Sequence, residues 1–404
     1  MREGTVLFLL LALSAVIRFT VITVLSIEPV SDSLTYMTMT RTMLDTGHMD
    51  DGMGNVAFYS SGYPLFLVPF FALFGDTPAV VQVVNALLGV GSVLLVYLCG
   101  RWVLPDWRWA MVPALLWAFY PPAILYTEYV AKENLLIVVF LLQVLMLLQY
   151  SGSPRGGLLA LLLGLVFGVG LLTGPAILLT GLVIVVVVAE LDIRRPGAMR
   201  WGRVLVFVLG CALALTPWLS YTNAKLGAPV LNNNGKFNLY LGNNPAAEVY
   251  LVGIQHTPLG PRWAELRTRG EVAAFSYLAD EAVAYILTHP GRTLWLGVGR
   301  LIRFWRPPIH EGRGGNQSTL ETLIRLAWLV CYSFIFLTAL LPLVFFRRLQ
   351  RSHWILCATI LLYWALHGAA FVLFRFRLTT MPIVCLMSAC GLYFLYQQWR
   401  TRAT

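Results

Sequence analysis

Long apolar runs recur along almost the whole chain, and they limit its fold more than any other feature. A helix needs about 20 apolar residues to cross the roughly 30 Å of hydrocarbon in a bilayer. A lipid-embedded backbone must also satisfy its hydrogen bonds within helices or a closed barrel. Ten runs have suitable length: 5–25, 79–101, 108–126, 134–150, 157–173, 175–190, 204–221, 320–346, 354–373 and 378–397. The sequence therefore predicts an all-α polytopic membrane protein with about ten transmembrane helices.

The charges indicate how these helices are oriented. Only 12% of the residues are charged, against roughly 25% in soluble domains, so the net charge of +10 favours membrane orientation over nucleic-acid binding. We expect no nucleic-acid partner. Basic residues of short loops recur at alternate helix ends: Arg2; Arg101 and Arg108; Arg155; Arg194, Arg195, Arg200 and Arg203; Arg347, Arg348 and Arg351; Arg400 and Arg402. These ends, and with them both termini, are expected to be cytoplasmic.

The opposite, outer face carries two longer segments. Residues 32–47 and 61–75 predict helices that lie on the membrane surface, because the first ends at a glycine suited to a C-terminal cap and the second is short and interrupted by proline. Residues 222–319 are expected to form a small outer loop domain. It would separate an N-terminal transmembrane module, 1–221, from C-terminal transmembrane helices in 320–404.

Two carboxylates at outer helix ends are candidate catalytic groups, because charge inside hydrocarbon is costly and its placement is informative. Asp32 follows the first apolar run, with no Lys or Arg until Arg41. It would either cap the next helix or act as a general base. Glu133 would either pair locally with Lys132, or cap its own helix, or take part in the chemistry.

Two arginines stand at the outer start of the last helix. In "FRFRLTTMP", Arg375 and Arg377 would either snorkel to lipid phosphates or hold one specific phosphate through the planar guanidinium fork. Glu128 is expected to be a solvated loop residue. The cysteines all fall within apolar runs and His256 and His310 have no ligand-spaced partner, so we assign no metal ligand and leave the need for a divalent metal open.

Several stretches, taken in order, resemble the bacterial polyprenol-phosphate-dependent glycosyltransferases of family 39. This C-type fold includes the lipid A aminoarabinose transferase and the protein O-mannosyltransferases. Asp32 and Tyr36 match the family's opening Asp-Glu-x-x-Tyr pattern. "SSGYPLFLVPFFALFG", "TPWLSYTNAKLGAPV" with "NLYLGNNP", and "RFRLTTMP" match later motifs. The chain departs from the family at Ser33, Thr35, Gly174 and the pair Thr222-Asn223.

The resemblance implies a function and assigns roles to the candidate residues. A sugar would move, with inversion, from a polyprenyl-phosphate donor to a hydroxyl of an acceptor lipid, protein or glycan, at the outer face of a bacterial inner (plasma) membrane. Asp32, free of neighbouring cations, would act as base, and Glu133 would position hydroxyl groups. The phosphate would be held by Arg375, with Arg377 or Lys132 as further candidates. The sugar and acceptor pocket would be lined by Tyr36, Tyr59 and Tyr63.

Two other classes of function remain open. A lipid-linked-sugar transporter or flippase would need polar groups near the midplane of the membrane and usually has related halves, and neither is evident. A non-catalytic scaffold of the same fold is favoured by the departures at Ser33, Thr35 and Gly174. The sequence names neither the sugar nor the acceptor.

Overall fold

The computed structural model describes residues 2–25, 27–150, 156–190, 200–307 and 319–403, and within these ranges the chain is helical and has no strand. Six helices are long and apolar enough to cross a membrane: α1 (Glu3–Val24), α4 (Pro78–Val103), α7 (Glu133–Tyr150), α8 (Gly156–Thr173), α10 (Trp201–Leu226) and α15 (Thr319–Val344). The predicted all-α membrane architecture is confirmed.

The other predicted spans are also helical, but they are shorter, interrupted or less apolar. The run 108–126 divides into α5 (Trp107–Ala118) and α6 (Pro121–Leu125), because a proline disfavours helical backbone at the residue before it. The run 175–190 gives the 3₁₀ helix η1 (Pro175–Thr180) followed by α9 (Gly181–Val188). The last two runs give α16 (Arg351–Leu366) and α17 (Met381–Ala403). The number of ten spans is therefore not confirmed.

Small residues allow a close helix contact between α8 and α10. A Cβ atom added at Gly164 would lie 2.1 Å from the carbonyl oxygen of Phe207, and one added at Gly210 would lie 2.3 Å from that of Leu161. Neither position has room for a side chain, so the two backbones meet directly. Such small-residue contacts are typical of helices that pack within a membrane, where close packing replaces the hydrophobic driving force.

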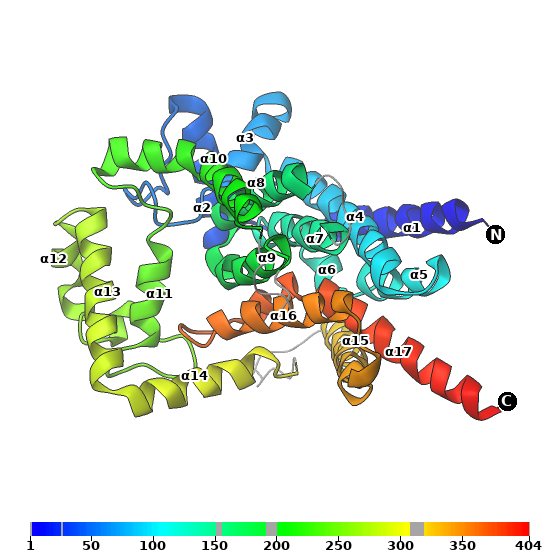
Figure 1. Ribbon diagram of the computed structural model, residues 1–404. Coiled ribbons are helices and arrows are strands. Elements are labelled where there is room, and N and C mark those ends of the chain that lie inside the picture. The colour runs from blue at the N-terminus through cyan, green and yellow to red at the C-terminus, as the bar shows by residue number, and fades with distance from the viewer. Residues whose placement is uncertain (1, 26, 151–155, 191–199, 308–318, 404) are drawn as a thin grey trace.

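The two predicted surface helices form with nearly the predicted bounds, as α2 (Asp32–Thr46) and α3 (Gly62–Phe74). Gly47 ends α2 in the left-handed conformation, with φ of 67°, as expected for a C-terminal cap. Both helices lie at the end of the bundle that the C-terminal part of α10 reaches (Figure 1).

Residues 227–307 form a helical unit, here called the loop unit, that joins α10 to the C-terminal helices. It contains α11 (Asn234–Gly242), η3 (Ile254–His256), η4 (Gly260–Arg262), α12 (Trp263–Arg267), α13 (Glu271–Thr288) and α14 (Pro290–Phe304). The short helices η5 (Phe346–Arg348) and η6 (Phe374–Thr379) precede α16 and α17. The described ends of the chain lie on the side of the bundle opposite the loop unit (Figure 1).

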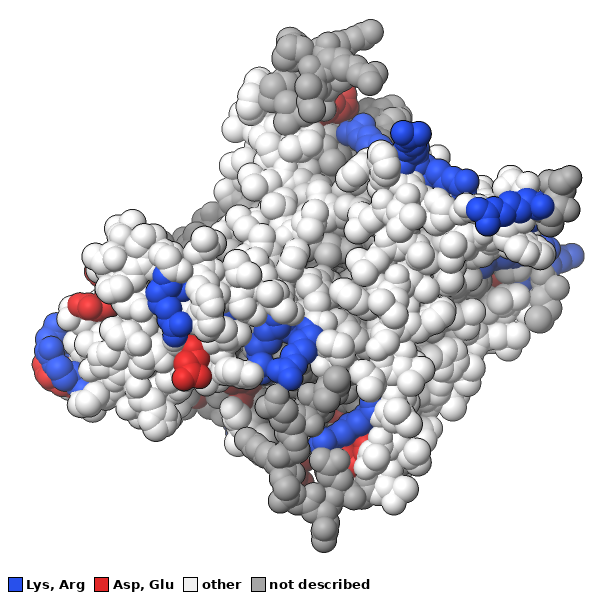
Figure 2. Space-filling view, turned by 90° about the horizontal axis from the view of Figure 1, so that it is seen from below, with Lys and Arg blue, Asp and Glu red and all other residues white. Residues whose placement is uncertain are grey.

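The surface of the bundle suits a lipid environment. On the face seen in Figure 2, a wide zone without Lys, Arg, Asp or Glu separates a row of basic side chains from mixed charges at the opposite end. Large apolar side chains of α1 and α10 are exposed, among them Phe8 (69%) and Leu205 (69%). Exposure of so much apolar surface to water would cost free energy, whereas lipid accommodates it. The protein is therefore an integral membrane protein.

Candidate active site

The site begins at a strained backbone turn before α2. Ser31 has φ of 52° and ψ of −122°, which is unusual for a residue other than glycine. The turn makes Asp32 the first residue of α2, and no side chain caps this helix. The alternative interpretation of Asp32 as a helix cap is therefore wrong.

Asp32 meets an arginine from the far end of the chain. Nη2 of Arg375, on η6, donates to Oδ2 of Asp32 at 2.6 Å, and Nε of Arg375 lies 3.6 Å from Oε1 of Glu133. The expectation that Asp32 stands free of cations is wrong for this structure, because a partner 343 residues away cannot be recognised from local sequence. Two carboxylates thus share one guanidinium, and Glu133 is the more deeply buried of the two, with 5% of its side chain exposed against 27%.

Lys132 adds a second positive charge to this cluster of Asp32, Glu133 and Arg375. Loss of hydration on burial lowers the pKa of Lys132, and the carboxylates of Glu133 and Asp32 only partly oppose that effect. Burial also disfavours the charged form of Arg375, but the same two carboxylates outweigh it and raise the pKa of Arg375. Arg375 therefore stays charged, whereas burial disfavours the charged form of Lys132.

The three predicted pocket tyrosines lie behind Asp32 in one aromatic group. The hydroxyl of Tyr59 donates to Oδ1 of Asp32 at 3.3 Å, and burial followed by the Asp32 charge raises the pKa of Tyr59 to about 12. The ring of Tyr36 packs edge-on against Tyr59 and Tyr63, with centroids 5.8 and 5.6 Å apart. Tyr36 and Tyr63 are buried, so Tyr59 is the member of the three best placed to contact a ligand.

Amide side chains hold the turn that presents Lys132 and Glu133. Asn85 accepts the Tyr63 hydroxyl at 2.9 Å and donates to the carbonyl oxygen of Tyr129 at 2.9 Å. Asn134 donates to the carbonyl oxygen of Tyr126, also at 2.9 Å. These bonds fix the turn between α6 and α7 against α4. Asn85 and Asn134 lie within apolar runs of the sequence, and no local pattern marks them as supports of the site.

Glu128 was predicted to be a solvated loop residue, and this prediction is wrong. Glu128 is 1% exposed, and its Oε1 accepts the backbone N–H of Ile27 at 3.0 Å. The bond ties the segment before α2 to the turn after α6. No local pattern marks this burial, because the N–H that Glu128 accepts comes from a segment 101 residues away.

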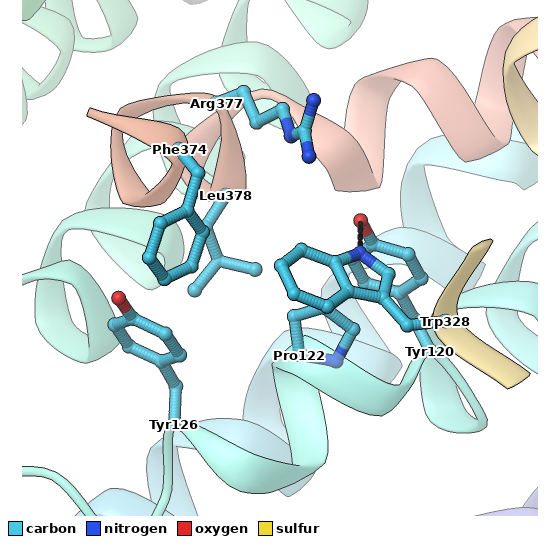
Figure 3. Close-up of a pocket in the computed structure, with 7 residues that line it drawn as sticks. All are labelled: Tyr120, Pro122, Tyr126, Trp328, Phe374, Arg377 and Leu378. Carbon is cyan, nitrogen blue, oxygen red and sulfur yellow. Dashed lines mark hydrogen bonds between the residues drawn. The ribbon is translucent and has the colours of Figure 1, made fainter. Parts of the chain in front are cut away.

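Arg377 does not join Arg375, although both were predicted to hold phosphate. Residues two apart on a 3₁₀ helix point to different sides, because each turn contains three residues. Arg377 is 3% exposed and donates to the carbonyl oxygens of Phe304 and Arg306, the latter at 2.5 Å. It lines a small pocket, with a cavity volume of about 10 Å³, whose other residues are Tyr120, Pro122, Tyr126, Trp328, Phe374 and Leu378 (Figure 3).

No group of three or more His, Cys, Asp or Glu side chains in the described ranges is arranged to hold a metal ion. The cluster itself offers two carboxylates, and both face Arg375.

Comparison with known proteins supports the fold. Residues 62–221 match the model of the dolichyl-phosphate-mannose-protein mannosyltransferase family, and no curated protein matches by sequence. Among solved structures, the archaeal oligosaccharyltransferase AglB from Archaeoglobus fulgidus, in complex with an inhibitory peptide and a dolichol-phosphate, is 15% identical with a TM-score of 0.53. The alignment covers 98% of this chain and 51% of AglB, so the chain spans about half the length of that enzyme.

A second similar structure is ArnT from Cupriavidus metallidurans bound to undecaprenyl phosphate, which is 14% identical with a TM-score of 0.50. That alignment covers 97% of this chain and 79% of ArnT. The resemblance stated from the sequence is thereby confirmed: the chain has the C-type fold of membrane glycosyltransferases, and its residues 62–221 match the mannosyltransferase family that shares this fold.

Proposed function

We propose that the protein is an inverting glycosyltransferase that moves a sugar from a polyprenyl-phosphate donor to an acceptor hydroxyl at the outer face of the membrane. The observation that carries the proposal is the meeting of Asp32, Glu133 and Arg375, from three distant segments, at one end of the bundle. Similar folds bind dolichol-phosphate or undecaprenyl phosphate, which supports a lipid phosphate as part of the donor.

The cations of the cluster suit the donor phosphate. Arg375 offers a planar fork to phosphate oxygens, and Lys132 makes no hydrogen bond or ion pair that would occupy it within the described ranges. Lys132 is partly buried and has no paired anion within the described ranges. The donor phosphate would supply that anion. As the sugar leaves, both cations would stabilise the charge that develops on the phosphate.

Asp32 would act as the general base once donor binding releases it. In the ligand-free structure its Oδ2 is held by Arg375, and a bound phosphate would compete for the same guanidinium. The freed carboxylate would accept the proton of the acceptor hydroxyl while that oxygen attacks the anomeric carbon. The bond from that carbon to the phosphate oxygen breaks, its electron pair leaves with polyprenyl phosphate, and the sugar carbon inverts.

Glu133 and Tyr59 would position the reacting groups. Glu133 lies near Nε of Arg375 and helps to keep the guanidinium in place, and Tyr59 donates to the Asp32 oxygen that Arg375 does not hold. Tyr59 remains a hydrogen-bond donor at physiological pH, because its pKa is raised to about 12 by burial and by the Asp32 charge. Its hydroxyl would therefore fix the orientation of the base.

The orientation in the membrane is also part of the proposal. Arg2, Arg101 and Arg400 are at helix ends on the side away from the cluster, in line with cytoplasmic termini under the positive-inside rule. The cluster would then face the exterior of a bacterial inner membrane. A lipid-linked donor could reach it from the bilayer.

A vesicle assay separates this function from the two alternatives. Purified protein is reconstituted with a polyprenyl-phosphate sugar labelled in the sugar, and free polyprenyl phosphate and labelled product are measured. A transferase releases polyprenyl phosphate only when an acceptor is present. Label that crosses the bilayer still attached to lipid would indicate a transporter, and donor binding with neither outcome would indicate a scaffold.

A further inference from the structure

A second pocket lies between the α2–α3 connection and the loop unit. It is open to solvent, and its cavity volume of about 180 Å³ is below the roughly 300–1,000 Å³ of typical drug-sized ligand sites, so it would hold one small unit. Its lining residues are Met53, Asn55, Phe58, Phe237, Trp263, Arg267 and Phe275. Four aromatic rings and two polar side chains therefore surround one space.

The walls of this pocket are held in place without a ligand. Glu271, near the start of α13, accepts the backbone N–H groups of Val56 and Ala57 at 2.7 and 3.0 Å and the side-chain amide of Asn233 at 2.9 Å. The ring of Phe58 stacks on Phe275, with centroids 5.0 Å apart. The connection and the loop unit are thus joined by hydrogen bonds and by a ring contact.

Asn55 presents a fixed acceptor to the pocket. Its Nδ2 donates to Oδ2 of Asp51 at 2.6 Å, and because a carboxylate only accepts, this bond sets the orientation of the amide. The other atom, Oδ1, is buried without a hydrogen-bond partner, and Asn55 is 5% exposed. Buried acceptors are rarely left unpaired, so Asn55 has an unused acceptor in the wall of the pocket.

Arg267 presents an uncompensated positive charge. The neighbouring Arg262 and Arg269 both pair with Glu265, at 3.4 and 3.5 Å, whereas Arg267 has no ion pair within the described ranges. Its guanidinium lies over the rings of Phe275 and Trp263, 5.2 and 5.9 Å from their centroids. Its Nη1 is buried and has no hydrogen-bond acceptor. The two unpaired atoms therefore suit two ligand groups: an anionic acceptor for Arg267 and a hydrogen-bond donor for Asn55.

We infer that this pocket binds an acidic sugar unit of the acceptor. The C–H face of a pyranose ring would pack on the aromatic walls, a hydroxyl would donate to Asn55, and a sugar carboxylate would pair with Arg267. An acidic peptide side chain supplies the carboxylate but no adjoining hydroxyl, so the sugar fits both unpaired atoms better.

The pocket adjoins the reaction centre through one ring contact. Phe58, which lines the pocket, packs edge-on against Tyr59 with centroids 4.9 Å apart, and Tyr59 donates to Asp32. A glycan seated in the pocket would thus extend toward the base. The assignment of this sugar to the acceptor rests on the proposed function, whereas its binding does not.

The experiment measures binding of glucuronate, glucose and N-acetylglutamate to purified full-length protein, by ligand-observed NMR without donor. Wild type should bind glucuronate in the millimolar range and more tightly than either other compound. Arg267→Gln should weaken glucuronate binding about tenfold, the loss expected for one charged hydrogen bond. Arg267→Lys should also weaken it, since the planar fork is lost. The control, Arg269→Gln, removes the same charge two residues away and should bind like wild type.

Three results would overturn the inference: no glucuronate binding to wild type, equal binding of N-acetylglutamate, or equal losses in Arg267→Gln and Arg269→Gln. Asp32→Asn should bind glucuronate like wild type, because Asp32 is outside the pocket. Glucuronate binding with no transfer from any polyprenyl-phosphate sugar would contradict the proposed function alone. Sugar transfer without glucuronate binding would contradict the pocket assignment alone.

Discussion

Replacement of Arg375 by Gln should weaken binding of polyprenyl phosphate without preventing folding. Gln keeps a polar side chain, although a shorter one, and removes the charge that Asp32 and Glu133 share. A hydrogen bond to a charged group contributes about 1.5–3 kcal/mol, and the lower part of that range applies because 30% of the Arg375 side chain is exposed. A loss of about 1.5–2 kcal/mol corresponds to a dissociation constant roughly 10- to 30-fold higher.

Replacement of Asp32, the partner of Arg375, should have the opposite effect on the binding of polyprenyl phosphate. Asp32→Asn removes the carboxylate that competes with phosphate for Nη2, so polyprenyl phosphate should bind Asp32→Asn as tightly as wild type or more tightly. Arg375→Lys should fall between wild type and Arg375→Gln, because it keeps the charge and loses the fork. Arg377→Gln should leave the affinity unchanged if the protein folds, since Arg377 holds backbone carbonyls elsewhere.

The assay is a titration of undecaprenyl phosphate into each purified variant in one detergent, followed by native mass spectrometry or thermophoresis. Arg41→Gln is the control, because Arg41, on α2, also pairs with an aspartate, Asp76, but is exposed and outside the cluster. Wild-type affinity in Arg375→Gln would refute the phosphate role. Weaker binding in Asp32→Asn would refute the exchange of partners.

Three further variants test other parts of the structure. Lys132→Met should keep or raise thermal stability and weaken polyprenyl phosphate binding about tenfold. Burial lowers the pKa of Lys132, so its charged form costs stability at pH below that pKa, and the cost fades as the pH rises toward the pKa of the unfolded chain. The gain in stability should therefore shrink as the pH rises. Ser31→Gly should raise stability by up to about 1 kcal/mol in chemical denaturation, because glycine adopts φ of 52° without strain. Gly210→Ala should lower stability by about 1–3 kcal/mol, since its Cβ would meet the Leu161 carbonyl oxygen; an unchanged melting temperature would contradict the close helix contact.

The sequence predicted those features that depend on local pattern. Apolar length predicted the spanning helices, and a glycine after a polar amphipathic stretch predicted the end of α2 at Gly47. The resemblance brought Asp32, Glu133 and Arg375 together as site residues. The structure confirms that they are in contact, while their roles remain proposals.

The missed features depend on contacts between distant segments. The Asp32–Arg375 pair joins the first and last parts of the chain, so the sequence around Asp32 showed only a carboxylate without a nearby cation. Arg375 and Arg377 look alike in sequence, and only the 3₁₀ geometry of η6 turns them to different sides. Glu128 is buried because a backbone N–H from the α1 exit reaches it, which no local pattern indicates.

The central claim, that Asp32 is the base of a sugar transfer, is tested most directly by single-turnover release of polyprenyl phosphate in proteoliposomes. Wild type and Asp32→Asn are loaded with the same labelled donor, and the acceptor is added after donor binding is confirmed in both. The account predicts that Asp32→Asn retains bound donor and releases polyprenyl phosphate at least about 100-fold more slowly, the smaller end of the range for general-base catalysis. Release by Asp32→Asn at a rate close to wild type would contradict it.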